Sequence, residues 1–148
     1  MQKTVAILMG LQGSGKSTFY KTHLSDGFVR VNLDTLKTRY REQLLIQDCM
    51  ARGNCYAIDN TNPTRAERAR YILHAKEEGY RVIGYFMESK IKDCVQRNAL
   101  REGDARVPEK AIAATSNKLE LPSYEEGFDE LYFVKNDGTT MTVEKWRI

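Results

Sequence analysis

The 148-residue sequence has few cysteines and no long hydrophobic run. Its three cysteines, Cys49, Cys55 and Cys94, are odd in number and lack C-x-x-C spacing. That pattern argues against a disulfide framework and against a zinc site, so we expect three buried thiols in a reducing cytoplasm. The longest apolar stretch covers only residues 5–9, and we therefore expect neither a signal peptide nor a membrane-spanning segment.

The sequence also lacks internal repeats, low-complexity segments and any linker-like stretch, so we expect residues 1–148 to form a single domain. The net charge is only +3, with 41% hydrophobic and 29% charged residues. This composition is typical of a globular protein. The weak positive charge permits a polyanionic substrate without requiring one.

The stretch GLQGSGKST at residues 10–18 matches the phosphate-binding pattern G-x-x-x-x-G-K-[ST] in full. Its glycines allow the backbone to approach a phosphate closely, and the following helix adds its positive N-terminal end. In this pattern Lys16 reaches the β- and γ-phosphates and the Ser17 hydroxyl binds Mg²⁺. A glycine-rich turn without a ligand is the structural alternative. The residues expected to bind ATP in this loop are Gly10, Gln12, Gly13, Ser14, Gly15, Lys16, Ser17 and Thr18.

Apolar runs alternate with amphipathic segments along the whole chain, which predicts an α/β fold. We expect a P-loop NTPase with a mainly parallel five-stranded sheet flanked by helices, a short helical lid at about residues 89–108 and a C-terminal hairpin strand. Asn62 is a plausible N-cap for the helix that follows Pro63. The expected strands are 5–9, 28–32, 55–58, 81–87, 131–134 and 140–143, and the expected helices are 15–24, 36–50, 64–78, 89–98 and 109–118.

Two aspartates follow strands whose carboxyl ends should meet the phosphate-binding loop at one edge of the sheet, where such folds bind ligands. Asp34 suits a general base for an acceptor hydroxyl, and a helix N-cap is its structural alternative. Asp59 suits an acid in the Mg²⁺ shell, or it only pins the loop and caps the next helix.

Arg97 and Arg101 lie four residues apart and can project from one helical face, with Arg106 in the following loop. Arginines in this position can close over the triphosphate and stabilise its developing charge. A solvated basic face is the structural alternative for this spacing.

Taken in order, these motifs resemble the 5′-kinase domain of polynucleotide kinases, within the adenylate-kinase-like P-loop kinases. The resemblance rests on the loop at 10–18, VNLDTL at 31–36, AIDNTNP at 57–63, RARY at 68–71, RN-x-x-R at 97–101 with VP at 107–108, and P-x-x-x-EGF at 122–128. It covers nearly the whole chain.

The resemblance implies an ATP- and Mg²⁺-dependent kinase that acts on the 5′ end of a nucleic acid, in nucleic acid repair. Asp34 matches the general base, Lys16 and Ser17 match the triphosphate and Mg²⁺ contacts, and Arg101 matches the lid arginine, with Arg97 in the same motif. The catalytic residues are then Asp34, Lys16 and Arg101, and the residues expected on the acceptor side are Asp34, Lys37, Asp59 and Asn62.

Two features depart from the family pattern. Leu33 stands where the family commonly has arginine, which removes one positive charge beside the base, although Lys37 follows three residues later. A D-x-D-x-[TV] phosphatase signature is lacking, so we expect no phosphatase domain in residues 1–148, and a separate ligase or phosphatase is a candidate partner. Kinases of small hydroxyl substrates or of seryl-tRNA, and an ATP-binding regulatory module or ATPase, remain as alternatives.

Overall fold

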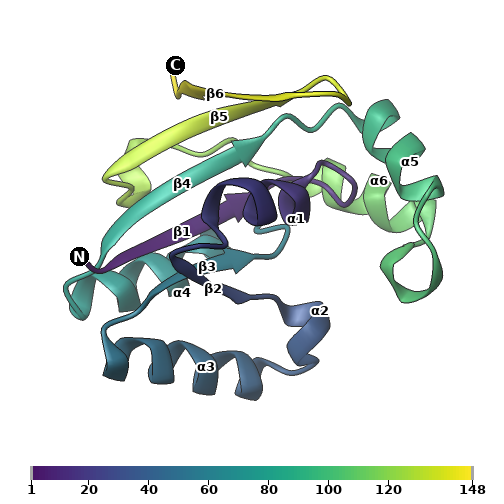
Figure 1. The fold of residues 1–148 in the computed structure, drawn as a ribbon. Coiled ribbons are helices and arrows are strands. Elements are labelled where there is room, and N and C mark those ends of the chain that lie inside the picture. Colours follow the sequence, from purple (N-terminus) through teal and green to yellow (C-terminus); the bar gives the residue numbers. More distant parts are fainter. Residues whose placement is uncertain (1, 148) are drawn as a thin grey trace.

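The computed structural model describes residues 2–147, and Figure 1 shows its arrangement of strands and helices. In chain order the elements are β1 (Thr4–Met9), α1 (Lys16–Phe19), the π-helix η1 (Tyr20–Leu24), β2 (Phe28–Val31), α2 (Leu33–Leu36), α3 (Arg39–Arg52), β3 (Cys55–Asp59), α4 (Arg65–Glu77), β4 (Arg81–Met87), α5 (Ile91–Ala99), the 3₁₀ helix η2 (Gly103–Ala105), α6 (Glu109–Lys118), the 3₁₀ helix η3 (Tyr124–Glu126), β5 (Glu130–Asn136) and β6 (Met141–Lys145).

The strands form one six-stranded sheet in the order β2-β3-β1-β4-β5-β6. Strands β1 to β5 pair in parallel, and β6 turns back to pair antiparallel with β5. The predicted α/β P-loop fold, with a mainly parallel sheet and a C-terminal hairpin strand, is therefore confirmed. Because the five parallel strands share one direction, the loops after β1, β2 and β3 meet at the same edge.

Strand β1 lies in the middle of the sheet, and all six of its residues are buried. Side chains alternate between the two faces of a strand, so each face receives half of them. Val5, Ile7 and Met9 pack with residues of α3 and α4, whereas Ala6 and Leu8 pack with the helix that follows the P-loop. A strand buried on both faces reads as a continuous apolar run, as this one does.

Two local expectations are wrong. The N-cap of α4 is Thr64, whose side chain accepts the Glu67 N–H, and not Asn62. The helix expected over residues 36–50 is α3, which begins three residues later than expected and follows a separate short helix, α2. Lys37 ends α2 with a φ of 77°, a positive value that residues other than glycine rarely adopt, and Thr38 caps α3.

Helices α5 and α6 pack against each other beyond the sheet (Figure 1) through a small cluster of Leu11, Cys94 and Ile112. The predicted lid region, residues 89–108, contains α5 and η2, and α6 follows directly after it. The cysteines are buried, as expected. Within residues 2–147, no helix has the length and apolar character needed to cross a membrane.

Candidate functional site

The loop between β1 and α1 is packed tightly at two of its glycines. A Cβ on Gly13 would lie 2.4 Å from the backbone oxygen of Cys94, and one on Gly15 would lie 2.7 Å from Asn136 Nδ2. Both glycines have positive φ angles, 82° and 100°. The buried Ser14 hydroxyl has no hydrogen-bond partner among the described residues. A buried polar atom without a partner is uncommon in a folded protein, and it fits a loop built to receive an anion.

Lys16 is buried at the start of α1, where its Nζ donates to the backbone oxygens of Gly10 at 3.0 Å and Leu11 at 2.8 Å. Burial lowers the pKa of Lys16 from 10.5 to about 8, while the negative charge of Asp59 opposes that shift and the positive charge of Arg101 adds to it. Loss of solvent around an ammonium group disfavours its charged form, and an anion beside it restores the charge. A phosphate bound beside Lys16 would therefore stabilise its charged form.

Ser17, Asp59 and Arg30 form a compact polar group beside Lys16. The Ser17 hydroxyl donates to Asp59 Oδ2 at 3.2 Å, Arg30 Nε donates to the same oxygen at 2.7 Å, and the other end of the guanidinium donates to Ser17 Oγ at 2.9 Å. A hydroxyl and a carboxylate are oxygen ligands of the kind that Mg²⁺ prefers. These residues therefore fit a magnesium site, which corresponds to the first of the two roles that the sequence leaves open for Asp59.

Asp34 lies exposed in the first turn of α2 and does not cap it. The cap is Asn32, whose side chain accepts the Thr35 N–H at 3.0 Å and also donates to the backbone oxygen of Asp59. The alternative interpretation of Asp34 as an N-cap is therefore wrong. Its carboxylate stays available for another role.

A cleft of about 210 Å³ runs between the P-loop, α2 and the loop after β3. Asp34 and Gln12 line the same cleft, so the proposed base and the phosphate-binding loop open onto one space. Lys37 is exposed and is not among the lining residues. The lining consists of Gln12, Leu33, Asp34, Arg39, Asn60, Thr61, Asn62, Pro63, Glu67, Tyr71 and Val107.

A buried polar cluster forms one side of this cleft. Arg39 donates to Glu42 at 3.0 Å and to the Tyr71 hydroxyl at 2.7 Å, and that hydroxyl lies 3.0 Å from both carboxylate oxygens of Glu42. Asn60 donates to Glu42 at 3.1 Å. Burial, followed by the Glu42 charge, raises the pKa of Tyr71 to about 12. The phenol thus remains protonated and holds the carboxylate.

A second cleft of about 490 Å³ lies on the other side of the P-loop, between Gly15, Thr18 and the turn that joins β5 to β6. Arg97 lines it and ties its walls together by donating to the backbone oxygens of Gly13 and Asn136, both at 3.2 Å. Arg101 donates to the Ala105 oxygen and acts on the charge of Lys16. Arg97 thus contacts the P-loop directly, whereas the hydrogen bond of Arg101 stays within its own segment.

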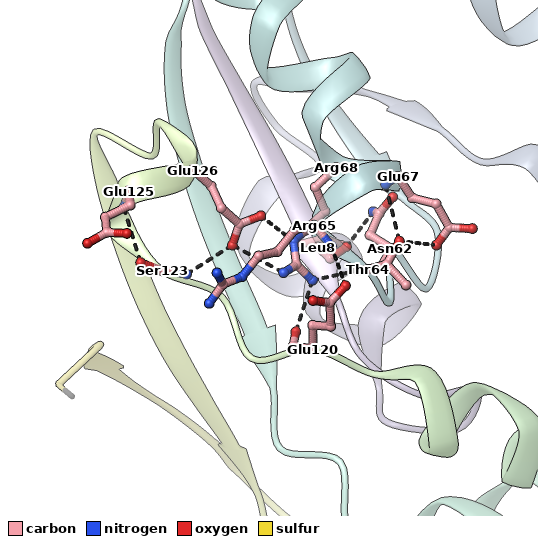
Figure 2. A network of polar contacts seen from close by, with 10 residues as sticks. All are labelled: Leu8, Asn62, Thr64, Arg65, Glu67, Arg68, Glu120, Ser123, Glu125 and Glu126. Atoms are coloured by element: carbon pink, nitrogen blue, oxygen red, sulfur yellow. Dashed lines mark hydrogen bonds and ion pairs between the residues drawn. The ribbon is translucent and has the colours of Figure 1, made fainter.

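The loop after β3 is fixed from behind by Arg68, whose side chain is fully buried in α4 (Figure 2). Its guanidinium contacts both oxygens of Glu126, at 2.8 and 3.1 Å, and the backbone oxygen of Asn62 at 3.0 Å. The Asn62 side chain donates to the backbone oxygen of Leu8 at 2.7 Å. Asn62 lines the cleft of about 210 Å³, but its side-chain amide holds the end of β1.

Sequence reasoning missed three residues of the site. Arg30 reads as an ordinary polar position of a strand, and Arg39 and Glu42 read as the mixed charges of a helix surface. Glu42 is 4% exposed, although its position near a helix start gave no sign of burial. The RARY motif was noticed at Arg68, but its partner lies 58 residues away and no local pattern links the two.

Comparisons with known proteins show which family this chain is related to. A family model described as an AAA domain matches residues 38–122, more than half of the chain. The putative bifunctional polynucleotide phosphatase/kinase of Acanthamoeba polyphaga mimivirus is 31% identical over 158 aligned residues, covering 99% of this chain and 37% of that protein. The bifunctional polynucleotide phosphatase/kinase of Schizosaccharomyces pombe is 29% identical over 84% of this chain and 31% of that protein.

The chain thus spans about a third of the length of these two relatives.

Solved structures of other proteins have the same fold. A gluconokinase from Sinorhizobium meliloti superposes with a TM-score of 0.60 at 16% identity, covering 89% of this chain and 82% of that one. Kti12 of Chaetomium thermophilum in complex with ADP-AlF3 gives 0.65 at 13% identity, covering 90% and 89%. With a P-loop kinase fold, a family match over more than half its length and relatives named as polynucleotide kinases, the chain belongs to the AAA domain family of P-loop NTPases.

Proposed function

We propose that this protein is an ATP-dependent kinase that transfers the γ-phosphate to the 5′-hydroxyl of a polynucleotide. The observation that carries the proposal is the shared cleft: Asp34 lines it from α2 and Gln12 lines it from the P-loop. An acceptor hydroxyl in that cleft lies between a carboxylate and the bound triphosphate, which is the arrangement that in-line transfer requires. The polynucleotide acceptor is supported by the two relatives named as polynucleotide phosphatase/kinases.

On the donor side, the P-loop backbone and Lys16 hold the β- and γ-phosphates, and Arg97 and Arg101 approach them from α5 and its end. The second cleft, between Thr18 and the β5–β6 turn, has room for the nucleoside. When bound at Ser17 and Asp59, Mg²⁺ would supply charge neutralisation between the phosphates. The protein thus contributes mainly position and positive charge.

On the acceptor side, Asp34 takes the proton of the attacking hydroxyl. Arg39 is the single cation among the described residues that line the cleft, where Asp34 and Glu67 are acidic. Its guanidinium is half exposed and uses one terminal nitrogen on Glu42 and Tyr71. The remaining donors suit an anionic acceptor in a chain where Leu33 supplies no charge.

A kinase of a small hydroxyl substrate is the second candidate. It is favoured by the mixed charge of the cleft, with two carboxylates and one guanidinium, and by the apolar Leu33 beside the base. The fold is also that of a gluconokinase. Salt separates the two candidates, because binding of a polynucleotide weakens steeply as salt rises, whereas binding of a neutral acceptor does not.

The test is transfer from γ-labelled ATP with Mg²⁺ to a 5′-hydroxyl oligonucleotide, a nucleoside 3′-phosphate and a panel of nucleosides and sugars. Asp34→Asn should keep ATP affinity and lose transfer by about 10²-fold or more, because the amide cannot accept the proton. Asp26→Asn, an exposed acid in a distant turn, is the matched control and should transfer normally.

Label on the oligonucleotide that disappears in Asp34→Asn supports the proposal. Label on small acceptors alone would assign the protein to the second candidate. Full transfer by Asp34→Asn would show that the carboxylate is not the base. ATP binding without transfer to any acceptor would favour a nucleotide-binding module.

A further inference from the structure

Arg30 occupies a particular place in the candidate metal site. It extends from β2, a strand at the edge of the sheet, and its guanidinium lies on two oxygens at once: Asp59 Oδ2 at 2.7 Å and Ser17 Oγ at 2.9 Å. These are the two side-chain oxygens that the Proposed function assigns to Mg²⁺. The guanidinium charge already lies on this pair of oxygens, so a metal ion that binds them meets its repulsion and competes with it for the same ligands.

The carboxylate of Asp59 needs a cation at this place. Its side chain is 1% exposed, and removing a carboxylate from water is costly unless a positive charge lies beside it. Lys16 is nearby, but its Nζ donates to the backbone oxygens of Gly10 and Leu11 and makes no hydrogen bond to this carboxylate. Arg30 therefore provides the direct partner.

Arg30 is also able to leave. Its side chain is 33% exposed, and its hydrogen bonds to Asp59 and Ser17 are the only ones that it makes to side chains among the described residues. The Arg68 side chain, by contrast, is fully buried, and its guanidinium makes four hydrogen bonds. A partly exposed arginine can rotate into solvent with its charge fully hydrated, so exchanging Arg30 for another cation needs no change in the backbone.

We propose that Arg30 is a resident cation of the metal site, which Mg²⁺ must displace, so that the metal enters together with the nucleotide. The inference rests on the assignment of Ser17 and Asp59 to the metal in the proposed function. A metal ion alone has to compete with the guanidinium for one carboxylate and one hydroxyl. Triphosphate oxygens add ligands and negative charge, and they shift the competition toward the metal.

The consequence is that nucleotide and metal bind with positive coupling, and Arg30 sets its size. Two ligands that favour the same displaced position of Arg30 each make binding of the other easier. The site then avoids holding a divalent cation without a substrate phosphate.

The experiment measures Mn²⁺ binding by electron paramagnetic resonance and by calorimetry, with and without ADP, for the parent protein and Arg30→Met. We expect Arg30→Met to bind Mn²⁺ alone about tenfold or more tightly, because a full positive charge has left the metal ligands. With ADP present, the difference between the two proteins should shrink. Arg81→Met is the matched control, since Arg81 pairs with Glu130 at a similar exposure of 36% but far from the P-loop.

A second readout uses stability. Without Arg30 the buried Asp59 carboxylate lacks its partner, so Mg²⁺ alone should raise the melting temperature of Arg30→Met but not that of the parent or of Arg81→Met. Arg30→Gln keeps a donor for Asp59 without the charge and serves if Arg30→Met does not fold. In the parent, the Nε–H resonance of Arg30 should lose its protection when Mg²⁺ and ADP are added together.

Equal Mn²⁺ affinity in parent and Arg30→Met would overturn the inference, as would an Arg30 resonance unchanged by Mg²⁺ and ADP. If the parent binds no Mn²⁺ even with ADP, the metal assignment itself fails and the inference fails with it. A protein that shows the expected metal behaviour but labels no oligonucleotide would leave this inference standing and overturn the polynucleotide acceptor.

Discussion

Two of the arginine–carboxylate pairs near the loop after β3, Arg68–Glu126 and Arg30–Asp59, are built differently. In the Arg68–Glu126 pair the guanidinium is fully buried and contacts both carboxylate oxygens and two backbone oxygens (Figure 2). In the Arg30–Asp59 pair the guanidinium is one-third exposed and shares a single carboxylate oxygen with a hydroxyl. The first pair is suited to hold the backbone, and the second to exchange one cation for another.

The comparison teaches that burial of the carboxylate alone does not define the role of an ion pair. Both carboxylates are nearly buried, with exposures of 8% and 1%. The difference lies in the arginine, through the number of its donors that are used and its access to water. Arg68 is buried and uses four of its five N–H donors, whereas Arg30 is partly exposed and uses two, which leaves its guanidinium a path into solvent.

The largest effect is expected from Arg68→Met, which leaves Glu126 buried without its partner and frees the Asn62 and Glu120 oxygens. The free energy of unfolding should fall by about 3–5 kcal/mol, as for other buried pairs that lose one member. Urea denaturation measures this loss. Glu126→Gln, which keeps an oxygen acceptor for Arg68, should be milder, and a loss below about 1 kcal/mol in Arg68→Met would break the comparison.

A smaller effect, on ATP binding, is expected from Lys16, a buried cation that donates to backbone oxygens instead of a carboxylate. Its pKa of about 8 means that the folded protein loses this charge at mildly alkaline pH, and a bound triphosphate should raise the pKa again. ATP affinity should therefore fall about tenfold between pH 7 and pH 9, with proton uptake on binding that calorimetry in buffers of different ionisation enthalpy detects.

The effect of pH on folding stability is opposite to its effect on ATP affinity. Because burial lowers the pKa of Lys16 below its unfolded value of 10.5, the unfolded chain binds more protons between about pH 8 and 10.5. The contribution of Lys16 to the free energy of unfolding therefore increases with pH across this window. Lys16→Met should remove the pH dependence of ATP affinity, and an unchanged dependence in that variant would assign it to another group.

The smallest effect is expected for an ion pair whose two side chains are both exposed. Arg52 and Asp48 pair at 3.1 Å on the surface of α3, with exposures of 69% and 55%. Arg52→Gln should change the free energy of unfolding by no more than about 0.5 kcal/mol in urea denaturation, because exposed pairs four residues apart in a helix contribute little. A loss above about 1 kcal/mol would mean that exposure does not rank these pairs.

Local pattern was enough to predict much of the fold. The glycine-rich loop, the parallel strands and the antiparallel return at β6 follow from apolar runs, turn residues and spacing. The break between α2 and α3 escaped prediction because it depends on Lys37 adopting a positive φ, which lysine does not favour. Thr64 caps α4 because the helix begins at Arg65, and Asn62, two residues before the cap, donates to the Leu8 oxygen, a contact across 54 residues.

The candidate site was predictable where a motif carries its own geometry and not where it depends on partners distant in sequence. Asp34 and Gln12 line one cleft because the parallel strands bring the loops after β1 and β2 to the same edge of the sheet. Arg30 and Arg39 gain their positions from Asp59 and Tyr71, which lie 29 and 32 residues further along the chain. Neither pairing leaves a signal in the local sequence.

The P-loop and the loop after β3 are joined by two hydrogen bonds. Gly10 N–H donates to the Thr61 oxygen at 3.0 Å, and the Asn62 side chain donates to the Leu8 oxygen at the end of β1. A residue inserted into either loop would break these bonds and misalign both. Divergence of substrate range on this scaffold should therefore proceed by replacement of cleft side chains, at positions such as Leu33 and Arg39, with the two loop lengths unchanged.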